Sequence, residues 1–207
     1  MKSLDARILV AIFHKPGKDD ENFELLKVQL ASFEIYIPRV NFFGNKWKET
    51  KAYVLSHGYD SLFIICSDVK IVMGDIGKKI REFATSNDIG VYGFGTVNNC
   101  TFTWLKYNNI EQTKSVPFIE GYCFGVNKGL LKYLELENVY GYGLDVEMGY
   151  KSHLNKFNCI LSNDVCISHA YGKSYNDHEA TREYESFLLG NPHIHKYLKD
   201  LNIYTPV

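Results

Sequence analysis

The feature that most constrains this sequence is a short apolar run with a carboxylate just behind it. Residues 62–65 read Leu-Phe-Ile-Ile, with polar residues on both sides. Such a run is too short for a helix and is typical of a strand covered on both faces of its sheet. Ligands of open α/β sheets gather beyond the carboxyl ends of the strands, so Asp68 is well placed to hold a cation or a polar substrate. Taken alone, the segment also fits an ordinary loop aspartate that accepts backbone hydrogen bonds.

The chain before this run alternates between strand and helix patterns. A second apolar run fills residues 8–13 and ends at the turn-forming Pro16 and Gly17. Strands that alternate with helices favour a parallel sheet, so we expect the two apolar runs to be adjacent, parallel and buried. We predict, in chain order, a strand at 7–13, a helix at 21–33, a strand at 34–37, a helix at 47–55 and the strand at 62–65.

The second half of the chain is more mixed. Alternating residues at 101–107 place Phe102 and Trp104 on one face, which predicts a half-exposed, antiparallel strand. The sequence therefore predicts an α/β fold with a mostly parallel central sheet flanked by helices and a mixed or antiparallel second half. The other predicted elements are helices at 75–86, 127–134, 144–157 and 177–189, and strands at 89–92, 117–126, 159–161 and 165–168.

Length and charge narrow the class of protein. A chain of 207 residues suits a single domain over 1–207. Its 23 Lys and Arg nearly balance its 24 Asp and Glu, without long runs of one sign, so we expect no nucleic-acid partner. No stretch approaches 18 apolar residues and no signal peptide is evident, so we expect a cytoplasmic protein without a transmembrane segment. Five cysteines without a Cys-x-x-Cys pair argue against disulfides and structural zinc.

Four segments in a fixed order carry a family resemblance. They are Cys-Ser-Asp-Val-Lys-Ile at 66–71, Phe-Ile-Glu-Gly-Tyr-Cys-Phe-Gly-Val at 118–126, Gly-Tyr-Gly-Leu-Asp-Val-Glu at 141–147 and His-Ala-Tyr-Gly-Lys-Ser-Tyr at 169–175. Together they resemble the inverting glycosyltransferases of family 2, which have the A-type, nucleotide-diphosphosugar transferase fold. The resemblance implies a nucleotide-sugar-binding part at about 1–93 and an acceptor and catalytic part at about 94–207.

The resemblance also implies roles for single residues. Asp68 stands in the metal motif, and with His169 it would hold Mn²⁺ or Mg²⁺, which neutralises the diphosphate as it leaves. Asp145, at a helix start, would be the base that takes a proton from the acceptor hydroxyl. Its neighbour Glu147 points elsewhere, because residues two apart on a helix do not share a face. The expected ligands are a nucleotide-diphosphosugar donor and a carbohydrate or other hydroxyl acceptor, contacted by Ser67, Glu120, Gly121, Lys173, Ser174 and Tyr175.

Two departures from the family pattern leave an alternative open. Cys66 stands where the first acid of the metal motif would be, and no clear acid follows the second predicted strand. The alternative is an inactive protein of the same fold that binds nucleotide sugars or carbohydrates. A nucleotidyltransferase is a poorer match, because the turn at 14–18 is too short and too poor in glycine for a phosphate loop.

Overall fold

The two apolar runs form adjacent, parallel, buried strands, as predicted. In this computed structural model, which describes residues 6–170 and 177–203, β1 (Ile8–Phe13) pairs in parallel with β3 (Ser61–Cys66). Side chains of β1 and β3 alternate between two clusters of buried residues, one on each face of the sheet. This double burial explains why both runs are continuously apolar.

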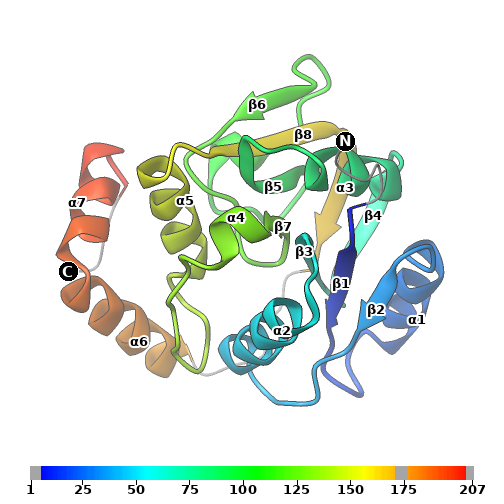
Figure 1. Cartoon of the computed structure of the whole chain (residues 1–207), viewed down its shortest axis with the longest axis horizontal. Helices are drawn as coiled ribbons and strands as arrows, with labels where there is room; N and C mark the ends of the chain where they lie inside the picture. Colours follow the sequence, from blue (N-terminus) through cyan, green and yellow to red (C-terminus); the bar gives the residue numbers. More distant parts are fainter. Residues whose placement is uncertain (1–5, 171–176, 204–207) are drawn as a thin grey trace.

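The two strands belong to a mixed sheet of eight strands in the described part of the chain. Its order is β2-β1-β3-β7-β5-β8-β4, and β6 pairs with β8 beside this path (Figure 1). The pairs β1–β2, β1–β3 and β5–β8 are parallel, and the other four pairs are antiparallel. The remaining strands are β2 (Glu34–Tyr36), β4 (Val69–Met73), β5 (Ile89–Thr96), β6 (Thr113–Ser115), β7 (Cys123–Asn127) and β8 (Asn158–His169).

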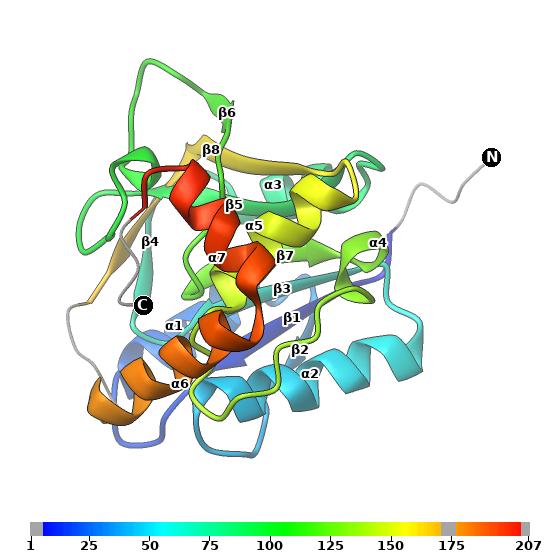
Figure 2. The same ribbon diagram turned by 90° about the vertical axis from the view of Figure 1, so that its left-hand side faces the viewer.

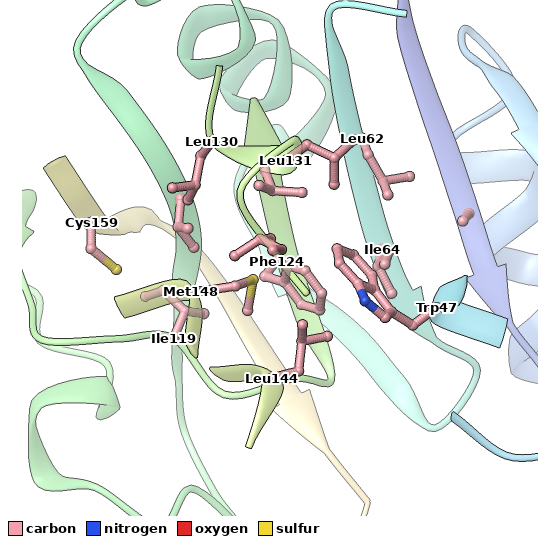
Figure 3. Packing of buried hydrophobic residues seen from close by; sticks show 14 of the residues in the cluster. Trp47, Leu62, Ile64, Ile119, Phe124, Leu130, Leu131, Leu144, Met148 and Cys159 are labelled. Atoms are coloured by element: carbon pink, nitrogen blue, oxygen red, sulfur yellow. The ribbon is translucent and has the colours of Figure 1, made fainter. Parts of the chain in front are cut away.

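Helices cover both faces of this sheet. One face packs against α2 (Phe43–His57), α4 (Lys128–Leu131) and α5 (Leu144–Leu154), and Figure 3 shows Trp47 and Met148 meeting around Phe124 there. The other face packs against α1 (Asp20–Gln29) and α3 (Ile76–Ala84). Near the end of the chain, α7 (Pro192–Asp200) lies beside α5, and α6 (Asp177–Gly190) packs against α7 (Figure 2). No described helix has the length and apolar character needed to cross a membrane.

The prediction of a strand at 101–107 is wrong. This segment holds a short 3-10 helix, η1 (Thr103–Leu105), and the rings of Phe102 and Trp104 stack on each other with centroids 4.5 Å apart. Both rings then meet the ring of Phe118 edge-on. The alternation therefore comes from an aromatic cluster rather than from the two faces of a strand.

Several predicted boundaries also change. Residues 117–122 form no strand, and only β7 follows them. Asn127 makes no side-chain capping bond to α4, because its amide donates to the carbonyl oxygens of Phe83, Ser86 and Ile89 instead. The two short strands predicted at 159–161 and 165–168 are one strand, β8, with a register shift in its pairing to β5. Strand β4 and helix α7 were not predicted.

Candidate active site

The two residues proposed as metal ligands meet at one edge of the sheet. Asp68 lies in the turn between β3 and β4, and β4 runs antiparallel to the end of β8, with Val69 opposite His169. The amide of Ala170 donates to the carbonyl oxygen of Asp68 over 3.0 Å. This register brings the carboxylate Oδ2 of Asp68 to 3.4 Å from Nε2 of His169. The predicted proximity of Asp68 and His169 is therefore present in the fold.

The turn that carries Asp68 is fixed from α1. Asn22 donates from Nδ2 to the carbonyl oxygens of Ser67 and Val69, at 2.6 and 2.8 Å. Ser67 is buried, and its amide donates to the carbonyl of Phe13 at the end of β1. Within the described residues, the Oδ1 atom of Asp68 is buried and has no hydrogen-bond partner. A buried carboxylate oxygen without a donor is an acceptor for a ligand.

His169 is held from the loop after β5. Its backbone amide donates to Oδ1 of Asn98, and its carbonyl accepts from Nδ2 of Asn99. Its ring Nδ1 lies 3.4 Å from the carbonyl of Asn99, so Nδ1 carries a proton and Nε2 is the atom turned toward Asp68. Burial lowers the pKa of His169, but the hydrogen bond and charge of Asp68 outweigh burial and raise it overall.

Asp68 and His169 fit a hard divalent cation only if oxygen atoms of a bound substrate complete its coordination. Asp68 and His169 offer one free carboxylate oxygen and one imidazole nitrogen, and the described residues hold no cluster of three or more His, Cys, Asp or Glu that could bind a metal. Mg²⁺ and Mn²⁺ are commonly held by one or two protein ligands together with phosphate oxygens. Cys66 does not add a ligand, because burial and the charge of Asp68 raise its pKa well above the ordinary value and keep it a thiol.

Asp145 opens α5, as predicted. The helix follows Gly143, whose φ of 94° is in the left-handed region that favours glycine, and Oδ1 of Asp145 accepts from the amide of Val146. Burial, with a contribution from the charge of Glu120, raises the pKa of Asp145 to about 6. A carboxylate with this pKa is ionised at neutral pH and is a stronger base than an ordinary aspartate.

Glu120 connects the two ends of the site. Its Oε1 accepts from the amide of Thr101, and its buried Oε2 has no hydrogen-bond partner within the described residues. Burial is the main cause of the raised pKa of Asp145 and Asp68 the main cause of the raised pKa of His169, and the negative charge of Glu120 adds to both. Gly121 follows in the same turn, where an added Cβ would lie 3.5 Å from the ring of Phe43.

Glu147 has a structural role instead. It is buried inside α5 and accepts from the amides of Glu135 and Leu136 at 2.6 and 3.0 Å. These bonds hold the segment after α4 and occupy both carboxylate oxygens of Glu147. Lys173, Ser174 and Tyr175 lie outside the described residues.

The residues that hold Asp68 and His169 in place were not predicted from the sequence. Asn22, Asn98 and Asn99 act through hydrogen bonds to backbone atoms, and such contacts leave no spacing pattern in a sequence. One signal was present: consecutive asparagines after a strand favour a turn, and Asn99 does adopt a positive φ of 52°. Tyr122, partly buried against the core, stacks on the ring of His169.

No protein-family model and no curated protein matches the sequence, whereas several solved structures share its fold. A197 from STIV aligns over 79% of this chain and 86% of its own, with a TM-score of 0.53 and 14% identity. GalNAc-T7, solved with UDP, GalNAc and Mn²⁺, aligns over 82% of this chain but only 44% of its own, with a TM-score of 0.52 and 9% identity. A glycosyltransferase involved in the glycosylation of the major capsid of PBCV-1 reaches a TM-score of 0.47, which is too low to carry an argument. The predicted glycosyltransferase-type α/β fold is confirmed, and at these identities the likeness concerns the fold alone.

Proposed function

We propose that this protein transfers a sugar from a nucleotide-diphosphate donor to an acceptor hydroxyl, with inversion at the sugar carbon. One observation carries the proposal: Oδ2 of Asp68 and Nε2 of His169 lie 3.4 Å apart at the carboxyl end of β3, with the other carboxylate oxygen of Asp68 buried and unpartnered within the described residues. The set thus combines a cation-binding pair with a separate carboxylate base. A cation can neutralise the leaving diphosphate and a base can take the proton of the acceptor, so both suit sugar transfer.

The pair Asp68 and His169 would hold Mn²⁺ or Mg²⁺ through the free Oδ1 of the carboxylate and Nε2 of the imidazole. Bound there, the cation would neutralise the charge that develops on the leaving diphosphate. Asn99 keeps the proton on Nδ1, which orients Nε2 toward Asp68. The Mn²⁺ of GalNAc-T7, on a similar fold, supports a cation as cofactor.

Other residues would act on the acceptor and the sugar. Asp145 takes the proton of the acceptor hydroxyl, and its raised pKa suits that task at neutral pH. Glu120 offers the unpartnered Oε2 to a hydroxyl of donor or acceptor, and Gly121 keeps the turn beside it small. Ser67 holds the Asp68 turn, and Lys173, Ser174 and Tyr175 are assigned to the diphosphate by family resemblance.

The rival is a protein that binds the donor without turning it over, and Cys66 motivates it. A thiol in place of the first motif acid leaves Asp68 as the only acid of the motif. Binding would then remain and transfer would be lost. The two proposals differ in turnover and not in affinity.

The test has two parts. Thermal unfolding is measured against a panel of nucleotide diphosphosugars with and without Mn²⁺, because a ligand of the native state raises Tm by mass action. The stabilising donor is then incubated with the protein and candidate hydroxyl acceptors, and the anomeric configuration of the product is read by NMR. Stabilisation without any product favours the rival, product of retained configuration refutes inversion, and the absence of any stabilising donor refutes both proposals.

A further inference from the structure

Lys46 carries a buried positive charge beside the candidate site. It lies on α2, is only 9% exposed, and donates from Nζ to the backbone carbonyl of His14, just after β1. Phe13, the residue before His14, pairs with Cys66, the last residue of β3. The ammonium group therefore lies at the carboxyl ends of β1 and β3.

Among the described residues, no carboxylate pairs with this ammonium group. The charged side chain that acts on it is Lys15, a second cation, and Cys66 is a neutral thiol. Burial, together with the charge of Lys15, lowers the pKa of Lys46. A buried charge without an opposite charge is costly, because a single carbonyl cannot replace the lost hydration.

Lys51, on the same helix, is a lysine whose charge is balanced by carboxylates. It also donates from Nζ to a backbone carbonyl, that of Leu134. Two carboxylates act on it, however: Lys151 chiefly lowers the pKa of Glu135 and Lys51 adds to this, and the charge of Lys51 also opposes the burial that raises the pKa of Glu147. The protein thus compensates the charge of Lys51 internally, whereas in the described part of the chain it leaves Lys46 facing a second lysine.

Strand pairing links Lys46 to the proposed cation site. Lys46 donates to the carbonyl of His14, and Phe13, the residue before it, pairs with Cys66 and accepts from the amide of Ser67, next to Asp68. An anion bound at Lys46 would therefore lie next to whatever Asp68 holds. A diphosphate has this shape, since it spreads negative charge over several linked oxygen atoms that can reach both positions.

We propose that Lys46 is an anion-binding residue of the donor site and contacts a phosphate of the nucleotide diphosphate. The inference deepens the proposed function and rests on it for the identity of the donor. The anion site itself does not depend on sugar transfer. The opposite charge that Lys46 lacks in the free protein is then supplied by the ligand.

Inorganic pyrophosphate tests the anion site alone. Thermal unfolding of the full chain is followed with rising pyrophosphate in EDTA, so that no divalent cation at Asp68 contributes. We expect pyrophosphate to raise Tm of the wild type, and Lys46→Met to weaken its binding about tenfold or more, the usual scale for a charge-assisted contact. The matched control is Lys51→Met on the same helix, which should bind pyrophosphate as the wild type does.

The ligand-free variants distinguish binding from a structural role. Lys46→Met removes an uncompensated buried charge, so its Tm should not fall and is expected to rise by about 2 to 4 °C. Lys46→Gln keeps a donor for the carbonyl of His14 and provides the same binding test if the Met variant does not fold. No pyrophosphate shift in the wild type, or a full shift in the Lys46 variants, overturns the inference even if sugar transfer is observed. Loss of the shift in these variants upholds it even if no transfer is found.

Discussion

The ring of His169 lies nearly parallel to the ring of Tyr122, with centroids 4.1 Å apart. This stacking fixes the plane of the imidazole, while the Tyr122 hydroxyl is 3.0 Å from that of Thr96. We expect Tyr122→Phe to keep Mn²⁺ affinity nearly unchanged and Tyr122→Leu to weaken it about 2- to 10-fold, the range given by aromatic stacking energies. Calorimetric titration with Mn²⁺ measures both. Equal losses in the two variants would mean that the hydroxyl, not the ring, matters.

Shared ligation by Asp68 and His169 predicts strong non-additivity. Asp68→Ala and His169→Ala should each lower Mn²⁺ affinity and metal-dependent donor affinity, and the double variant should lose clearly less than the sum of the two losses. A site that is already lost cannot be lost again. Donor affinity is measured for the wild type and all three variants, with Mn²⁺ and with EDTA. Additive losses of affinity would show that the two residues act separately.

Asp145→Asn should lower the rate of transfer while raising the stability of the protein. We expect transfer to fall by about 100-fold or more with donor binding retained, because Asn fills the same volume but cannot take a proton. The raised pKa means that folding disfavours the ionised carboxylate, so removing the charge should raise the free energy of unfolding at pH 7 by up to about 3 kcal/mol. Kinetics and chemical denaturation provide the two readings, and near-normal transfer would move the role of base to Glu120.

The pH dependence of transfer should report the same carboxylate. With the pKa of Asp145 at about 6, the active, ionised form is lost as pH falls through that value. We expect kcat/KM to be level above about pH 7 and to fall about tenfold per unit below about pH 5.5. An unperturbed aspartate would hold the plateau to about pH 5. A plateau reaching that far would exclude a buried Asp145 as the base.

Glu147→Ala should damage the fold rather than the chemistry. The substitution leaves the amides of Glu135 and Leu136 without their acceptor, at a cost of about 2 to 4 kcal/mol. Tm should fall by about 5 to 12 °C. Transfer per folded molecule should stay within about threefold of the wild type at a temperature well below the transition. A loss of turnover as large as that of Asp145→Asn would contradict the structural assignment.

Local patterns were sufficient for the parts of the fold that are locally determined. Continuous apolar residues identified β1 and β3, because both faces of these strands are buried. The same logic failed at Phe102 and Trp104, where tertiary packing on Phe118 produced an alternation that imitates a strand. It also missed β4, whose residues are mostly exposed and are ordered by pairing with β8.

For the proposed site, the sequence could indicate only residues that stand in a family-like motif. Asp68, Asp145 and His169 were proposed as site residues because each follows or opens an element in a recognisable order, and their roles stay a prediction. Their supports were not proposed, because Asn22 and Asn98 are recruited only by three-dimensional proximity. Lys46 shows the same limit: its burial without a carboxylate partner becomes visible only when the described neighbours around the ammonium group are known.

The pairing of β4 with β8 sets the order in which the proposed site can assemble. Asp68 follows β3 directly, but its partner His169 ends a strand that the ribosome delivers about a hundred residues later. Contacts so distant in sequence close late in folding, because the intervening chain must first lose its freedom. During synthesis, the chain would therefore acquire its joint cation affinity only once β8 has emerged, and Mn²⁺ binding would report completion of the sheet.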